Sequence, residues 1–144
     1  MRVVLDTNVL LSALFSRQST AAHVVNAWRR GAFDLTTCEL QLQEIREVTR
    51  RPNIRALIRP ALAGELVNQL QGMAKWIDTL PPVSRSPDPF DNFLLSLAQA
   101  DKADKADKAD VLVSGDKRGV LALKSHGACQ IITLRQFVDS MNIA

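Results

Sequence analysis

Cysteine is scarce in this chain, and long hydrophobic runs are missing from it. The 144 residues include only Cys38 and Cys129, and their wide separation matches no metal-ligand or redox-motif spacing, so we expect two thiols in a reducing cytoplasm. No apolar run approaches the ~20 residues of a membrane-spanning helix. The segment Met1–Asp6 has a short apolar run that ends in a carboxylate, unlike a secretory signal peptide. The sequence therefore predicts a cytoplasmic protein without a membrane segment.

The composition is that of a small globular protein. Hydrophobic residues make up 47% of the chain and charged residues 23%, which excludes disorder for most of it. The length fits a single domain over residues 1–144. The net charge of +3 is compatible with nucleic-acid binding without being diagnostic of it.

Positive charge is concentrated in one segment. Five arginines lie between Arg46 and Arg59, opposed only by Glu47. Four-residue spacing predicts that Arg46 and Arg50 share one helical face, and that Arg51, Arg55 and Arg59 share another. Such a stripe is either a solvated or protein-binding surface, or a set of contacts to phosphate groups.

Short apolar runs alternate with helical patterns along the chain. Strands are predicted at 3–5, 33–37, 75–78, 111–113 and 129–132, and helices at 20–30, 39–49, 61–73, 89–109 and 134–138. This alternation predicts a three-layer α/β/α sandwich, with a central parallel sheet covered by helices on both faces. Ligands bind such sheets beyond the carboxyl ends of the strands, where Asp6 and Asp116 follow the two most apolar runs.

Residues 100–110 form a low-complexity Ala-Asp-Lys repeat. A period of three does not match the helix, so its alanines do not form one face. We interpret it as a solvated extension of the preceding helix or as a hinge before the next strand. A lengthened connection can also let core elements exchange between protomers, which predicts a homo-oligomer.

Acidic residues occur where solvated surface charges are unusual. Asp6 and Asp116 follow buried strands, Glu44 lies between core-facing residues, and Asp91 follows Asp88-Pro89-Phe90. Each also has a structural explanation, as a turn or helix-cap residue or as a half-exposed helix charge. Together they are typical of a Mg²⁺ or Mn²⁺ site, since hard cations prefer oxygen ligands.

In this order the motifs resemble a PIN domain, most closely the toxin components of bacterial toxin–antitoxin pairs. The resemblance covers essentially the whole chain and is carried by four segments: Val3-Val4-Leu5-Asp6-Thr7-Asn8-Val9-Leu10, Glu44-Ile45-Arg46-Glu47-Val48 with Arg51-Pro52, Asp88-Pro89-Phe90-Asp91-Asn92-Phe93-Leu94, and Ala109-Asp110-Val111-Leu112-Val113-Ser114-Gly115-Asp116-Lys117. It implies the same sandwich fold, Mg²⁺- or Mn²⁺-dependent cleavage of RNA, dimers, and an antitoxin partner that blocks the site.

The resemblance also implies a set of site residues. By motif position, the catalytic and metal-binding acids are Asp6, Glu44, Asp91 and Asp116; Asn8 and Ser114 support them through hydrogen bonds, and Asp88 is an additional acid. The chain departs from the family in two ways. Arg118 stands where many relatives carry another acid, and the Ala-Asp-Lys repeat lengthens the spacer before the last motif.

The leading hypothesis is therefore a metal-dependent endoribonuclease in which Arg46, Arg50, Arg51 and Arg55 hold the RNA backbone. The main alternative is a catalytically silent protein of this fold that binds RNA or an antitoxin, which Arg118 and the repeat favour. Cleavage of DNA by a related mechanism is a third possibility. A dehalogenase-type phosphatase is a weaker interpretation, because it needs a second aspartate where this chain has Asn8.

Overall fold

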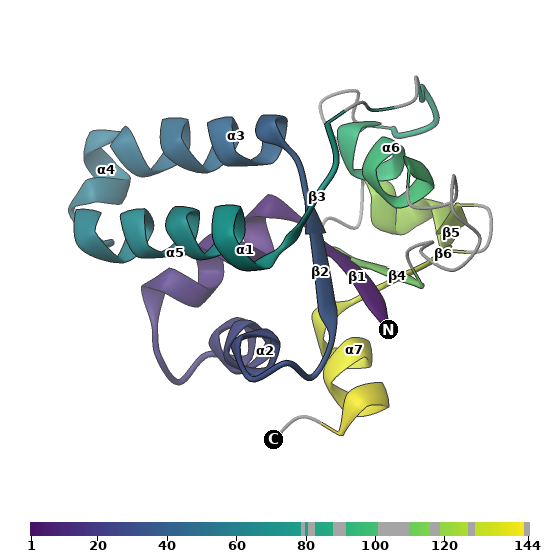
Figure 1. Cartoon of the computed structure of the whole chain (residues 1–144), viewed down its shortest axis with the longest axis horizontal. Coiled ribbons are helices and arrows are strands. Elements are labelled where there is room, and N and C mark those ends of the chain that lie inside the picture. The colour runs from purple at the N-terminus through teal and green to yellow at the C-terminus, as the bar shows by residue number, and fades with distance from the viewer. Residues whose placement is uncertain are drawn as a thin grey trace.

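A computed structural model describes residues 1–78, 80, 83–87, 92–100, 110–115, 119–126 and 129–142 of the chain. Within these residues, strands and helices alternate as the sequence predicts (Figure 1). The strands are β1 (Arg2–Leu5), β2 (Asp34–Thr37), β3 (Lys75–Trp76), β4 (Val111–Val113), β5 (Ser125–His126) and β6 (Cys129–Ile132). The helices are α1 (Thr7–Phe15), α2 (Thr20–Arg29), α3 (Glu39–Arg50), α4 (Pro52–Arg55), α5 (Pro60–Met73), α6 (Asn92–Ala100) and α7 (Leu134–Met141), with a 3₁₀ turn, η3 (Val120–Leu123).

The strands form one sheet in the order β3-β2-β1-β4-β6-β5. β1 pairs in parallel with both β2 and β4, and Leu5 lies opposite Val113 in the register with β4. The parallel sheet is therefore confirmed, except at one edge where β5 runs antiparallel to β6. β5 is only two residues long, too short for a periodic pattern, so the sequence does not predict it.

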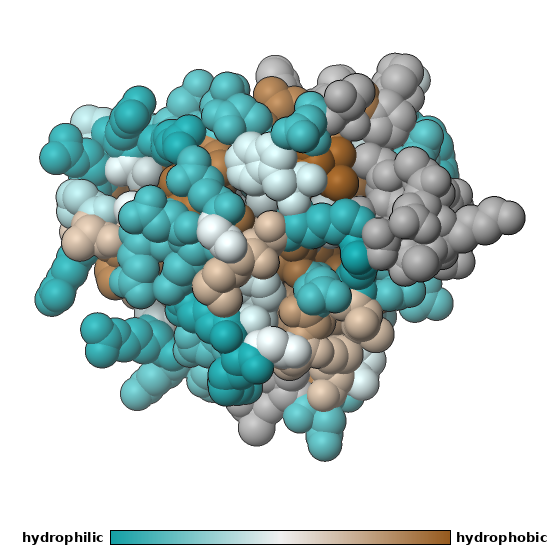
Figure 2. All heavy atoms as spheres, viewed as in Figure 1, coloured by the Kyte–Doolittle hydropathy of each residue, from teal (hydrophilic) through white to brown (hydrophobic). Residues whose placement is uncertain are grey.

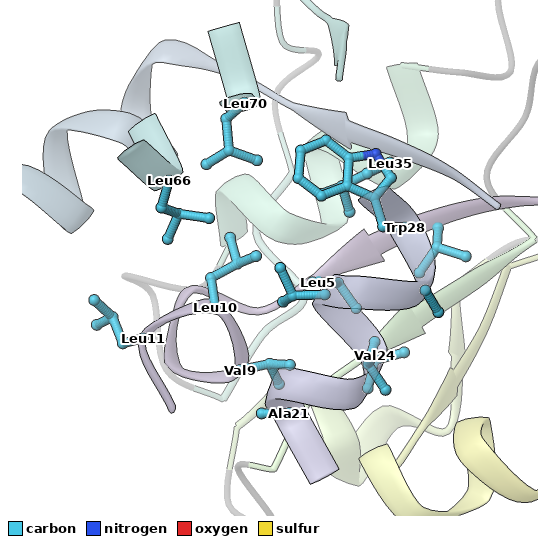
Figure 3. Packing of buried hydrophobic residues seen from close by; sticks show 14 of the residues in the cluster. Leu5, Val9, Leu10, Leu11, Ala21, Val24, Trp28, Leu35, Leu66 and Leu70 are labelled. Carbon is cyan, nitrogen blue, oxygen red and sulfur yellow. The ribbon is translucent and has the colours of Figure 1, made fainter. Parts of the chain in front are cut away.

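The central strands separate two hydrophobic layers. Val3 and Leu5 of β1 point into a core shared with α1, α2, α3, α5 and α7. Val4, between them, points into a second core built mainly by α6. Since all three residues are fully buried, the strand has no solvent-facing side, which explains its continuous apolar run. Leu5, Leu10 and Leu66 lie together in the larger core (Figure 3).

Local signals fix most helix ends. Gly31, with a φ of +84°, follows the end of α2, and Pro52 ends α3 and begins α4. Thr133 and Gln136 form a capping box at the start of α7. Helix α1 has no counterpart among the predicted elements. It begins directly at the Asp6 cap, in an Asp-Thr-Asn segment that fits a turn equally well.

The predicted helix over 89–109 is found as α6, Asn92–Ala100; residues 89–91 and 101–109, with most of the Ala-Asp-Lys repeat, lie outside the described residues. Cys38 and Cys129 are buried thiols, as expected, and burial raises the pKa of Cys38. None of the helices described by the structure is long and apolar enough to span a bilayer.

The position of α5 in the larger core predicts a large effect for Leu66→Ala. Leu66 is fully buried, so its truncation leaves a cavity, and we expect the free energy of unfolding to fall by about 2–5 kcal/mol. Leu57→Ala is the matched control, because Leu57 is 65% exposed and should change stability by less than about 0.5 kcal/mol. Urea unfolding of both variants measures the difference, and equal losses of stability would contradict this packing.

Candidate active site

Hydrogen bonds of its backbone N–H and of both carboxylate oxygens hold Asp6 at the carboxyl end of β1. Its backbone N–H donates to the Val113 carbonyl of β4 at 2.9 Å. Its Oδ1 accepts from the Asn8 N–H at 3.1 Å, and its Oδ2 accepts from the Ser114 hydroxyl at 2.8 Å. Asp6 is only 4% exposed, and Ser114 is fully buried. The supporting positions predicted for Asn8 and Ser114 therefore correspond to direct contacts with Asp6, made in the case of Asn8 by its backbone.

Glu44 reaches the same end of the sheet from α3. Its Oε2 accepts a hydrogen bond of 3.0 Å from the hydroxyl of Thr7, the buried residue that follows Asp6. Burial raises the pKa of Glu44, and the negative charges of Asp6 and Glu47 raise it further. The Thr7 hydrogen bond and the Arg51 charge lower the pKa without cancelling that rise. The site thus holds two carboxylates close enough to repel each other.

Gln41 fixes α3 against the strands. This fully buried side chain donates from Nε2 to the Leu5 carbonyl at 2.7 Å, and its Oε1 accepts from the Thr37 hydroxyl, also at 2.7 Å. Gln41 is three residues before Glu44, so both lie on one side of the helix. The bonds of Gln41 therefore set the position of Glu44 relative to Asp6.

An open groove of about 710 Å³ runs beside Glu44. Asn8, Glu47, Arg51 and Phe93 are among the residues that line it. Arg51 directly follows α3 as its cap residue, and it lines the same groove as Glu44. This site groove gives an extended ligand access to a carboxylate and to a positive charge together.

The remaining predicted acids, Asp88, Asp91 and Asp116, lie outside the described residues. Within the described ranges, no three acidic, histidine or cysteine side chains gather into a metal-binding cluster. Two described residues, each two positions from one of these acids in the sequence, do lie at the site. Phe93 lines the site groove, and Ser114 hydrogen-bonds to Asp6.

The predicted arginines divide between two surfaces. Arg51 lines the site groove, whereas Arg46, Arg50 and Arg55 line a separate groove between α3 and α5. The predicted pairing of Arg46 with Arg50 on one face is in accord with this arrangement. The shared helical face predicted for Arg51, Arg55 and Arg59 is wrong. Pro52 starts a new helix after Arg51, and Arg59 lies beyond that helix, at the cap of α5.

Sequence reasoning misses Thr7 and Gln41. Thr7 belongs to the Asp-Thr-Asn segment, which on sequence alone indicates a turn or a helix cap. Gln41 stands between Leu40 and Leu42 in a helix whose buried side is otherwise apolar, and a buried polar side chain requires a partner. Its partners are far away in the chain, so the sequence alone cannot identify them.

The raised pKa of Glu44 predicts that Glu44→Gln stabilises the metal-free protein at neutral pH. A carboxyl with a higher pKa in the folded state favours folding most below its ordinary pKa. This contribution is lost as the pH rises through the folded value. Gln keeps an oxygen for the Thr7 hydroxyl without the charge, so we expect a higher free energy of unfolding than native at about pH 7. The difference should shrink towards about pH 4.

Urea unfolding in EDTA at both pH values makes this measurement. Glu65→Gln, which removes an exposed carboxylate from α5, is the control and should change stability little at either pH. A Glu44→Gln protein that is less stable than native at neutral pH would contradict the repulsion described here.

Gln41→Leu tests the connection between α3 and β1. The substitution removes the partner of the buried Leu5 carbonyl and of the Thr37 hydroxyl, so we expect the free energy of unfolding to fall by about 1–3 kcal/mol. Gln43→Leu, on the exposed side of the same helix, should change it by less than about 0.5 kcal/mol. Comparable urea midpoints for the two variants would show that the Gln41 bonds contribute nothing.

Comparisons with known proteins agree with this fold. In three dimensions, the chain is similar to a chain in the crystal structure of VapBC2 from Rickettsia felis, in which these proteins are bound to a DNA fragment from their promoter. The match has a TM-score of 0.56 at 12% sequence identity and covers 92% of this chain and 98% of that one. No curated protein matches the sequence significantly. A family model described as PIN domain matches residues 2–118. This match spans most of the chain, including β1, α3 and β4, so the protein belongs to the PIN domain family.

Proposed function

We propose that this protein is a metal-dependent endoribonuclease that cleaves RNA phosphodiester bonds, and that it is the toxin of a toxin–antitoxin pair. The observation that carries the proposal is the meeting of Asp6 and Glu44 at the carboxyl ends of parallel strands, beside an open groove that contains Arg51. Membership of the PIN family supports nuclease chemistry at this place.

The donor set suits Mg²⁺ or Mn²⁺. Asp6 and Glu44 offer hard carboxylate oxygens. Burial and the nearby charge of Asp6 raise the pKa of Glu44, and a bound cation would offset both costs of the charged form. By motif position, Asp91 and Asp116 complete the set. These residues would hold a divalent ion, which would supply an activated water and neutralise charge on the leaving oxygen.

The chain's own residues hold and orient the reacting groups. The Ser114 hydroxyl and the Asn8 N–H fix the two oxygens of Asp6. Thr7 holds one oxygen of Glu44, whose carboxylate orients the attacking water. Arg51, in the same groove, binds a phosphate of the substrate by its guanidinium, which matches phosphate oxygens bidentately.

The test is cleavage of a labelled, mixed-sequence single-stranded RNA by the purified protein with Mg²⁺, Mn²⁺ or EDTA. We expect metal-dependent cleavage that Asp6→Asn and Glu44→Gln abolish. Ser114→Ala, which removes only a support of Asp6, should reduce it by about 10–100-fold. Asp34→Asn removes an exposed carboxylate at the opposite end of the parallel strands and serves as the control.

Cleavage that survives both Asp6→Asn and Glu44→Gln, in proteins with native melting curves, would reject this site. The second candidate is a catalytically silent PIN-fold protein that binds RNA or an antitoxin, favoured by Arg118 and the Ala-Asp-Lys repeat. Binding of RNA without cleavage under any metal condition would favour it. A parallel reaction with single-stranded DNA distinguishes ribonuclease from general nuclease activity.

Two partners belong to the same proposal. The motif resemblance supports an antitoxin protein that blocks the site in the cytoplasm. A homo-oligomer, formed by exchange of elements around residues 100–110, follows from the lengthened connection there. A monomeric mass in solution would contradict the exchange.

A further inference from the structure

The groove between α3 and α5 is a second concentration of positive charge, away from the site. α3 and α5 lie side by side and are joined through α4 (Figure 1). The groove between them has a volume of about 520 Å³ and is lined by Arg46 and Arg50 of α3 and Arg55 of α4. Asn68 and Gln71 of α5 also line it, and its described lining contains no carboxylate. The visible surface over these helices is mainly hydrophilic (Figure 2).

These arginines are accessible. Arg50 and Arg55 are exposed. Arg46 is half-buried and forms a solvent-exposed ion pair with Glu39 at 3.4 Å. Exposed ion pairs of this kind are weak, so a stronger anion can replace Glu39. Guanidinium groups bind phosphate oxygens bidentately, which makes a polyanion the best ligand for this lining.

The basic charge is continuous with the site. Arg50 and Arg51 are consecutive residues at the end of α3, yet Arg50 lines the α3–α5 groove while Arg51 lines the site groove. A flexible nucleic-acid strand with a phosphate bound to Arg51 at the site therefore has its following phosphates near Arg50. A second copy of this chain is a poor occupant, because a twofold interface sets identical patches against each other and would oppose the arginines.

We infer that the α3–α5 groove binds the backbone of the RNA strand outside the bond that is cleaved. Arg46, Arg50 and Arg55 contact its phosphates, and the amides of Asn68 and Gln71 add hydrogen bonds. The inference rests on the proposed function, since the same strand occupies both grooves. The interactions of the groove with the strand are independent of base identity and of the cleavage chemistry.

Gly64 provides a way to block the groove without disturbing the fold. It lies on α5 in the groove lining, and a Cβ built on it has no atom within 4 Å. Glutamate is a better helix former than glycine. Gly64→Glu is therefore expected to leave the melting temperature at or above the native value while placing a negative charge in the path of the RNA.

The experiment measures binding in EDTA, where cleavage does not interfere, by fluorescence anisotropy of a labelled single-stranded RNA of about 20 nucleotides over a range of salt. We expect the double variant Arg50→Gln with Arg55→Gln to bind at least about tenfold more weakly. It should also lower the slope of log K against log salt by about 1.4, because each phosphate that no longer has an arginine partner accounts for ~0.7. Gly64→Glu should weaken binding similarly.

The control is Arg30→Gln with Arg135→Gln, which removes the same charge from α2 and α7. Equal weakening of RNA binding in both double variants would show that binding depends only on the overall positive charge, and would overturn the inference. A native protein that binds no RNA in EDTA would also overturn it. Polyglutamate of matched charge that competes as well as RNA would reassign the groove to an acidic protein. A changed molecular mass of Gly64→Glu would reassign it to a second copy.

These outcomes are separate from those of the cleavage assay. If RNA binding depends on Arg50 and Arg55 but no metal supports cleavage, the inference about the groove is supported and the nuclease proposal is rejected. If cleavage depends on Asp6 and Glu44 while the groove variants bind RNA as tightly as the native protein does, the nuclease proposal is supported and the inference about the groove is rejected.

Discussion

The hydrogen bond from Ser114 to Asp6 joins the two central strands at the point where the site begins. A carboxylate that is 4% exposed is costly unless its oxygens find donors. Its donors include Ser114, directly after β4, and the Asn8 N–H in the first turn of α1. The need of the Asp6 carboxylate for these donors constrains three features of the fold. β1 must lie beside β4 in the register that sets Leu5 opposite Val113, α1 must start at Asp6, and the loop after β4 must turn with Ser114 facing β1. Once these are in place, Thr7 is buried where it can reach Glu44.

The sequence is most informative where one short pattern determines the outcome. The apolar run Val111–Val113, with two β-branched residues and polar residues on either side, favours a strand buried on both faces, and parallel strands bring their carboxyl ends to one edge. The positions of Asp6 and Ser114 can therefore be predicted without coordinates. Features that depend on distant partners cannot. Gln41 binds a carbonyl 36 residues away in the chain, and the two-residue β5 exists only because β6 pairs with it.

Helix α3 illustrates the same limit in a single element. Its pattern predicts a helix that ends before Pro52, and the structure agrees. The pattern does not reveal that its arginines serve two surfaces, because the break at Pro52 changes the direction of the chain between Arg51 and Arg55. The core stripe formed by Leu42 and Ile45 is fully buried. On either side of this stripe, the helix presents the Glu44 carboxylate to the site groove and the guanidinium groups of Arg46 and Arg50 to the α3–α5 groove. Opposite charges are therefore separated locally although the net charge of the protein is modest.

That separation has an energetic consequence for the site. Burial and, to a smaller extent, the negative charge of Asp6 disfavour the charged form of Glu44 in the folded protein. The large apolar core offsets this cost. The anchors of the site are short and buried, and they come from different elements: a serine after β4, a threonine in α1 and a glutamine in α3. Two like charges would move apart if a flexible loop carried either of them. Hydrogen bonds from Ser114 and Thr7 instead hold the two carboxylates in place. Under the proposed function this arrangement favours a bound cation, and Arg51 in the same groove would attract the phosphate on which that cation acts.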